Sequence, residues 1–169
     1  MINWIKSFFL DLEDSFTIKR NTITIDHTMT QNTPPVEPTM PAPPTSLLDR
    51  FCAAIAFREG ANPANNNEGN CKFYYGGYLP VYGVVKRSPG GFAMFPTKAQ
   101  GDLYLCNLII GIIKEHPQLT FFTFFAGSPS LGWGGYAPST DGNDPVSNSS
   151  QVATACGKLP NSLVAVILG

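Results

Sequence analysis

Glu59 is the side chain whose place in the sequence most clearly predicts chemistry. It ends an amphipathic segment, residues 46–59, and Gly60 follows at once. Phe51 and Ile55 precede Glu59 by eight and four residues, so the three side chains share the apolar face of the expected helix. A carboxyl held against apolar groups is shifted toward its neutral form, which raises its pKa. Such a glutamate can donate a proton near neutral pH.

A second interpretation of Glu59 needs no chemistry. A glutamate at a helix end often turns toward solvent, and Arg58 beside it could pair with its charge. The position of Glu59 alone leaves both interpretations open. The motifs that come after it in the sequence are what favour the proton donor.

Residues of the types that bind metals form no recognisable pattern. His27 and His116 are far apart, and the four cysteines show no Cys-x-x-Cys spacing. Asp141 and Asp144 lack the twelve-residue calcium loop with its central glycine and final glutamate. Asp144 is better explained as the cap of a helix that opens with Pro145. We therefore expect no metal and no cofactor.

The four cysteines differ in their surroundings. Cys52 and Cys106 lie in apolar helical runs, which predicts that they are core residues. A disulfide that involves Cys71 or Cys156 is left open by the sequence.

Composition excludes several classes of function. The chain has 169 residues and a net charge of -1, which gives no electrostatic footprint for nucleic acid. No apolar run reaches eighteen residues, so no membrane span is predicted. The first residues do not form a recognisable signal peptide, because Lys6 and Asp11 interrupt the apolar run.

Residues 1–45 are predicted to be an N-terminal segment with a proline-rich linker, ahead of a domain at 46–169. Apolar residues between Ile5 and Phe16 recur at helical spacing, and six of the fifteen prolines fall in 33–44. A stretch so rich in proline cannot bury a helix or a sheet against the domain. We expect the domain to fold without residues 1–45, and those residues to be able to contact a protein partner.

The fold class predicted for the domain is α+β and mainly helical. Residues 62–95 are dominated by Asn, Gly, Tyr and Phe, which favours hairpins and loops. The remaining segments are helical, with caps or proline and glycine at their ends. The expected helices are 46–59, a long one that opens at Thr97 and ends before Pro117, 121–125, and 145–156, followed by an apolar tail at 163–168 of strand-like or helical form.

Five short motifs occur in order between residues 58 and 145. They are Arg58-Glu59-Gly60, Asn65-Asn-Asn-Glu-Gly-Asn70, Gly91-Phe-Ala-Met-Phe-Pro-Thr97, Gly135-Tyr-Ala-Pro138 and Asp141-Gly-Asn-Asp-Pro145. This order resembles a lysozyme-like family of phage and bacterial sequences, over about residues 47–156. Each motif alone is weak, and the set of five in sequence is fairly specific.

The resemblance implies a lysozyme-like fold with a small β-hairpin region beside a catalytic cleft. It also implies cleavage of peptidoglycan glycan strands between N-acetylmuramic acid and N-acetylglucosamine, by a lytic transglycosylase or a hydrolase. Glu59 would match the family's general acid. The substrate-binding residues implied by the resemblance are Asn66, Asn67, Asn70 and Tyr136.

The sequence departs from the family's pattern in two places. Glu68 stands where the family usually has proline, and after Pro145 the expected tyrosine-containing helix reads Val-Ser-Asn-Ser-Ser. Glu68 is a candidate second carboxylate, which would lie about 5–5.5 Å from the acid in a retaining hydrolase and about 6.5–9.5 Å in an inverting one. A solvated turn residue is the other interpretation of Glu68, and it favours a transglycosylase with a single carboxylate.

Two functional hypotheses therefore arise from the sequence. The first is an enzyme that cleaves peptidoglycan, virion-associated or acting outside the cell or in the periplasm. The second is a non-catalytic structural or adaptor protein of a virion that has a lysozyme-like fold and docks through residues 1–45. Fold-level similarity alone cannot choose between them. The presence of Glu59 and of the asparagine turn favours the enzyme.

Overall fold

The computed structural model describes residues 46–60, 63–75 and 77–169. The chain separates into two units, Met1–Pro43 and Pro44–Gly169, and the described residues all belong to the second. The N-terminal segment predicted at 1–45 lies outside the described residues. The domain predicted at 46–169 falls within the second unit.

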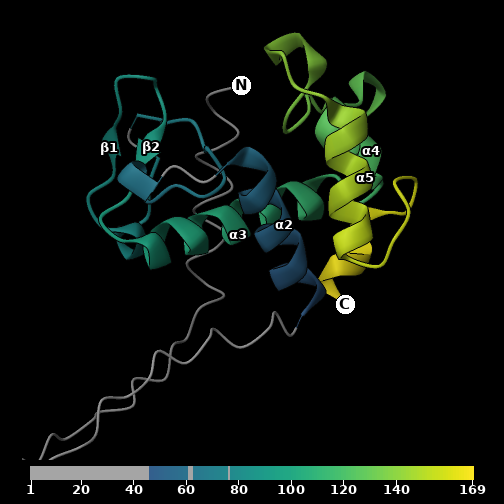
Figure 1. Ribbon diagram of the computed structural model, residues 1–169, viewed down its shortest axis with the longest axis horizontal. Coiled ribbons are helices and arrows are strands. Elements are labelled where there is room, and N and C mark those ends of the chain that lie inside the picture. The colour runs from purple at the N-terminus through teal and green to yellow at the C-terminus, as the bar shows by residue number, and fades with distance from the viewer. Residues whose placement is uncertain (1–45, 61–62, 76) are drawn as a thin grey trace, which may run out of the picture. The chain divides into compact units, whose positions relative to one another are not determined.

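The described part of the chain is mainly helical, with one small antiparallel sheet. Figure 1 shows α2 crossing α3, the strand pair at one end of α3, and α4 and α5 side by side at the other. This arrangement confirms the mainly helical α+β class. The principal elements are α2 (Leu47–Glu59), β1 (Lys86–Arg87), β2 (Ala93–Met94), α3 (Lys98–Glu115), α4 (Phe121–Ala126) and α5 (Pro145–Ala155).

Local hydrogen bonds begin the helices where the sequence predicts. Ser46 and Asp49 form a complete capping box at the start of α2, and Thr120 forms one with Thr123 at the start of α4. The side chain of Thr97 caps α3, and the side chain of Asp144 caps α5. A cap of this kind contributes about 0.5–2 kcal/mol, so each helix start is specified within a few residues.

Aromatic side chains fix α2 against α4. The rings of Phe51 and Phe124 meet edge to face with 5.3 Å between centroids, and Phe51 also contacts Phe121 at 5.4 Å. Phe51 and Ile55 are completely buried. The apolar face of α2 is therefore held in the core, and this sets the direction in which Glu59 points.

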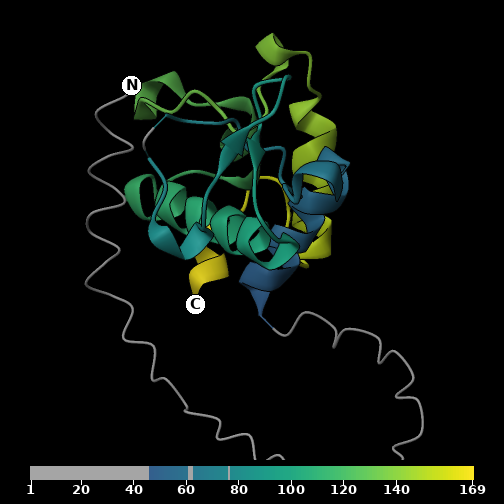
Figure 2. The ribbon, with the colours of Figure 1, turned by 90° about the vertical axis from the view of Figure 1, so that its left-hand side faces the viewer.

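The predicted hairpin region contains the strand pair β1–β2, seen from a second side in Figure 2. Lys86 pairs with Met94 and Arg87 with Ala93. An isolated bridge between Lys72 and Phe92 joins the preceding loop to this hairpin. The loop after the asparagine turn is therefore tied to the sheet.

Several aromatic residues of this region pack against α3 rather than standing free. Tyr104 on α3 contacts the rings of Tyr78, Tyr82 and Phe95 at centroid distances of 5.1–5.3 Å. The side-chain amide of Asn107 donates a 2.9 Å hydrogen bond to the hydroxyl of Tyr82. These rings are packing residues that attach the hairpin region to the long helix.

The C-terminal tail completes the core. It forms a 3₁₀ helix, Val164–Leu168, with Val164 and Ile167 buried. The backbone N–H of Val164 donates to the carbonyl of Leu119, and an isolated bridge pairs Leu163 with Thr120. The tail therefore combines the two expected forms: a short helix, and a single strand-like bridge before it.

The four cysteines are all free thiols. Cys52, Cys71 and Cys156 are buried and Cys106 is half-buried. Across the described ranges, no helix has the length and apolar character needed to cross a bilayer.

Candidate active site at the end of α2

Glu59 is the last residue of α2, as the sequence predicts. Gly60 follows in the left-handed conformation with φ 72°, which glycine adopts without a steric cost. The Gly60 N–H donates to the carbonyls of Ala56 and Phe57, which closes the helix. The chain therefore turns away immediately after Glu59 and leaves its side chain at the helix end.

The environment of Glu59 favours the protonated carboxyl. Burial raises the pKa of Glu59 above its ordinary value, while a hydrogen bond from Asn70 and the positive charge of Arg58 partly oppose the rise. Glu59 is only half-buried, so it is reachable from solvent. The direction of this shift is the one expected for a carboxyl on an apolar helix face.

Asn70 connects the asparagine turn to the end of α2. Its side-chain amide donates a hydrogen bond to the backbone carbonyl of Glu59. Asn70 and Asn66 both have left-handed backbones, with φ of 47° and 50°. Asparagine adopts this conformation more readily than most residues with a side chain, which explains why amides occupy these two positions.

The side chains of Asn66 and Asn67 bond to the backbone of the hairpin region. Asn67 is buried, donates 2.9 Å hydrogen bonds to the carbonyls of Cys71 and Ala93, and accepts one from the N–H of Cys71. Asn66 donates to the carbonyl of Phe95 at 3.0 Å. These contacts show that Asn67 and Asn66 stabilise the conformation of the turn. Direct contact of either side chain with substrate stays a prediction.

Tyr136 lies beneath the turn and near Glu59. Its hydroxyl donates a 2.9 Å hydrogen bond to the carbonyl of Gly69, and its ring stacks on Phe124 with centroids 5.4 Å apart. Burial raises the pKa of Tyr136 well above its ordinary value, and the charge of Glu59 adds to that rise. The structure thus brings together Glu59, Asn70 and Tyr136.

Cys71 is a neighbour of this group that the sequence did not single out. Burial raises the pKa of its thiol to about 12, a hydrogen bond with Tyr136 opposes the rise, and the charge of Glu59 adds to it. At neutral pH the thiol and the phenol are both uncharged. The charge of Glu59 raises the pKa of both groups, so these two neighbours of Glu59 add no charge of their own to the site.

Glu68 has a different set of partners. Its carboxylate pairs with the ammonium group of Lys98 at 3.5 Å, and Lys98 also pairs with Asp102 at 2.9 Å. Only 13% of the Glu68 side chain is exposed. Glu68 is thus attached to the start of α3 instead of being a freely solvated turn residue.

The asparagine turn packs directly on α3, and two glycines make this possible. A Cβ atom at Gly101 would lie 1.8 Å from the carbonyl oxygen of Asn66. A Cβ at Gly69 would lie 2.5 Å from Leu105 and 2.9 Å from the hydroxyl of Tyr136. Both contacts are far shorter than real atoms allow, so the position of the turn depends on these glycines.

Arg58 makes contacts that sequence reasoning did not find. Its guanidinium donates to the side-chain oxygen of Asn148 at 2.8 and 3.0 Å and to that of Gln151 at 3.1 Å. The partners lie on α5, about ninety residues away in the chain. Asn148 falls in the Val-Ser-Asn-Ser-Ser stretch that follows Pro145.

Among the described residues, no cluster of three or more histidine, cysteine, aspartate or glutamate side chains could hold a metal ion. The chemistry that the side chains around Glu59 can support is proton transfer by its carboxyl, next to the amide of Asn70 and the hydroxyl of Tyr136. Comparison with known proteins finds no matching family model, no similar curated protein and no similar solved structure.

Proposed function

We propose that this protein cleaves the glycan strands of bacterial peptidoglycan, with Glu59 as the general acid. The observation that carries the proposal is the half-buried Glu59 carboxyl, whose pKa is raised by burial at the end of α2. The five motifs shared with the lysozyme-like family support the same conclusion. A helical domain with a small sheet is compatible with a lysozyme-like fold.

In the proposed reaction, protonated Glu59 delivers its proton to the glycosidic oxygen as the bond from that oxygen to the sugar C1 breaks. The positive charge that develops at C1 must then be captured. Asn70 bonds to the backbone carbonyl of Glu59, and the charge of Glu59 acts on Tyr136, so both are neighbours of the acid. Both are therefore proposed as substrate-side residues of the site.

The ion pair of Glu68 with Lys98 favours capture of C1 by the substrate itself. The 6-hydroxyl of the muramic acid residue would attack C1, and its proton would pass to the Glu59 carboxylate left by the first step. The C6 oxygen then bonds to C1, and the product carries a 1,6-anhydro end. This is the reaction of a lytic transglycosylase, and it requires one carboxylate only.

Replacement of Glu68 by alanine tests this mechanism. We expect Glu68→Ala to keep most of the activity, because its carboxylate is held in an ion pair with Lys98. Purified protein would be incubated with peptidoglycan and the products would be identified by mass, since an anhydro end is lighter than a reducing end by one water. A loss of a hundredfold or more, together with reducing-end products, would make Glu68 an essential second carboxylate.

The setting proposed for this activity is a phage particle that acts on the cell wall. A component of this kind would meet peptidoglycan outside the cell or in the periplasm. Residues 1–45 are the segment proposed to attach the domain to a virion partner.

A further inference from the structure

Two free thiols meet where α2 crosses α3. Cys52 lies on α2 and Cys106 on α3, and their side chains are hydrogen-bonded to each other. Figure 1 shows the crossing of the two helices. Cys52 is buried and Cys106 is half-buried. The fold therefore places a covered thiol directly beside one that solvent can reach, although the two are far apart in the sequence.

Each of the two thiols shares its helix face with a carboxylate. Asp49 precedes Cys52 by three residues and Asp102 precedes Cys106 by four, and these are the spacings at which side chains are neighbours on a helix. The charge of Asp49 acts on both thiols, and the charge of Asp102 acts on Cys106. The contact of the two thiols therefore belongs to a wider contact between these two helix faces.

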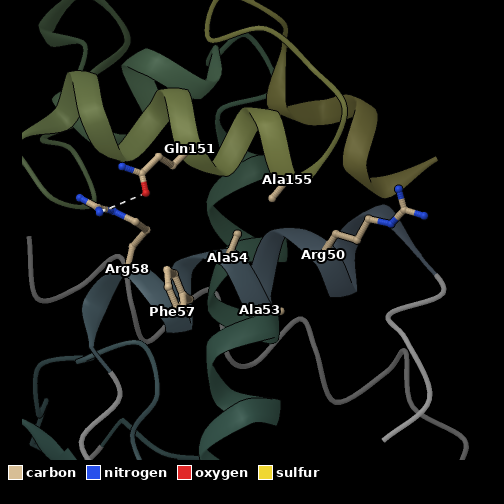
Figure 3. Close-up of a pocket in the computed structure, with 7 residues that line it drawn as sticks. All are labelled: Arg50, Ala53, Ala54, Phe57, Arg58, Gln151 and Ala155. Atoms are coloured by element: carbon tan, nitrogen blue, oxygen red, sulfur yellow. Dashed lines mark hydrogen bonds between the residues drawn. The ribbon is translucent and has the colours of Figure 1, made fainter.

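Cys52 also shares a face of α2 with Glu59. Figure 3 shows Ala54 and Arg58 on the side of α2 that faces α5, where Arg58 bonds to Gln151. Cys52 lies two residues before Ala54, about half a turn around the helix axis, and so on the opposite side. Glu59 follows Cys52 by seven residues, which is nearly two full turns. A covalent bond at Cys52 would therefore hold the face of α2 that ends in the proposed general acid.

The two thiols differ in reactivity. The hydrogen bond with Cys52 lowers the pKa of the Cys106 thiol, although burial and the charges of Asp49 and Asp102 oppose this. The same hydrogen bond raises the pKa of Cys52, and burial adds to the rise. The thiolate is the nucleophile in thiol–disulfide exchange, and reactive cysteines are accessible and often adjacent to a second cysteine. Cys106 is thus placed to react first with an external oxidant, and Cys52 is placed to react second.

We propose that Cys52 and Cys106 form a disulfide that joins α2 to α3 when the protein meets a small disulfide such as oxidised glutathione. The Cys106 thiolate attacks one sulfur of the oxidant, which forms a mixed disulfide and releases one glutathione thiolate. Cys52 loses its proton to that thiolate and attacks the Cys106 sulfur, so that the second glutathione leaves. The leaving thiolate takes up the proton that Cys106 lost, and two electrons have passed from the cysteines to two molecules of glutathione.

The compartment decides whether this bond is present. Disulfides persist outside the cell and in the periplasm, whereas glutathione and thioredoxin keep thiols reduced in the cytosol. The bond would connect residues more than fifty positions apart, which restricts the unfolded chain and stabilises the folded one. Formation of this bond requires no glycan cleavage, so the inference holds or fails independently of the proposed function.

Peptide mapping by mass spectrometry tests the bond. Folded, full-length protein is incubated with oxidised glutathione and quenched with acid. Remaining thiols are blocked with N-ethylmaleimide in denaturant, and the protein is digested with trypsin without reduction. Cys52 then lies in peptide 51–58 and Cys106 in peptide 99–114. We expect these two peptides to be joined with the loss of two hydrogens. Recovery of both with the blocking group, or a different cysteine pair as the main product, would overturn the inference.

Single substitutions test the order of the two steps. Cys52→Ala should stop the reaction at the mixed disulfide, so that peptide 99–114 carries one glutathionyl group. Cys106→Ser should leave the covered Cys52 unmodified. Cys156→Ala is the matched control, because this buried cysteine at the end of α5 takes no part, and the bond should form as in the wild type. A glutathionyl group on Cys52 in Cys106→Ser would contradict the proposed order. If Cys52→Ala fails to fold, the wild-type digest still decides whether the bond forms.

Thermal unfolding of the wild type measures what the bond does to the domain. The oxidised protein should unfold at a midpoint roughly 10 °C higher than the reduced protein, and dithiothreitol should reverse the difference. Cys106→Ser should show no difference between the two conditions. An unchanged or lower midpoint in protein that carries the bond would show that it does not stabilise the contact of α2 with α3, contrary to the inference.

Discussion

Glu59→Gln is expected to abolish glycan cleavage while the protein stays folded. Glutamine has nearly the same shape as glutamate and keeps a hydrogen-bonding side chain, but it has no proton to give to the glycosidic oxygen. A positioned general acid contributes about 10²–10⁴ in rate, so the loss should be at least of that size. Release of soluble sugars from insoluble peptidoglycan measures it, with Asp141→Asn as a matched control at an exposed carboxylate.

The stability of Glu59→Gln separates this explanation from unfolding. Burial raises the pKa of Glu59 in the folded state above its unfolded-state value. The contribution of the neutral carboxyl to the free energy of unfolding is therefore complete below the unfolded-state pKa, and it is lost as the pH rises through the folded-state pKa. Glutamine stays neutral at every pH. The variant should therefore unfold at the same temperature as the wild type, or a higher one, near neutral pH. Undiminished cleavage by this folded variant would show that Glu59 is not the general acid.

Gly101→Ala is expected to destabilise the domain and displace the asparagine turn. The added Cβ would lie 1.8 Å from the carbonyl oxygen of Asn66, a backbone atom that cannot rotate away. Overpacking of this kind costs about 1–3 kcal/mol and occasionally more, although alanine is the better helix former in isolation. Denaturant unfolding would show the loss as a lower midpoint with an unchanged slope.

Gly134→Ala is the matched control for Gly101→Ala, because a Cβ at Gly134 would have no atom within 4 Å. It should leave the unfolding midpoint nearly unchanged. Because Asn70 belongs to the displaced turn and bonds to Glu59, Gly101→Ala should also lower cleavage. A Gly101→Ala protein as stable and as active as the wild type would show that the turn does not need its close contact with α3.

The helices could be predicted from the sequence because their signals are local. Ser46 and Thr97 hydrogen-bond to backbone N–H groups within three residues, so the caps depend on neighbours that are visible in the sequence. The apolar run before Pro117 likewise predicts the long buried helix α3. The two-residue strands carry no such signal, and only a hairpin region between 62 and 95 could be expected.

The roles of the turn residues could not be predicted, because they depend on partners that lie far along the chain. Asn67 bonds to the carbonyl of Ala93, twenty-six residues later, and Glu68 pairs with Lys98 on another element. The motif has the same residues whether its amides contact a sugar or bond to the protein's own backbone. Only the fold distinguishes Asn70, which reaches Glu59, from Asn67, which shapes the turn.

The contact of Arg58 on α2 with α5 could not be predicted from the sequence either. The sequence suggested Arg58 only as a charge partner of Glu59, and it predicted no role for Asn148. Their contact joins residues ninety positions apart.

The titration of Glu59 in the folded protein, compared with the pH profile of cleavage, tests the central claim most directly. The carboxyl can be followed by ¹³C NMR in wild-type protein, with Glu59→Gln to assign its signal. We expect a pKa above the ordinary value for glutamate, and cleavage that falls as the pH rises through that same pKa, because only the protonated acid can donate. A Glu59 that titrates at or below the ordinary value, or cleavage that does not follow its titration, would contradict the account.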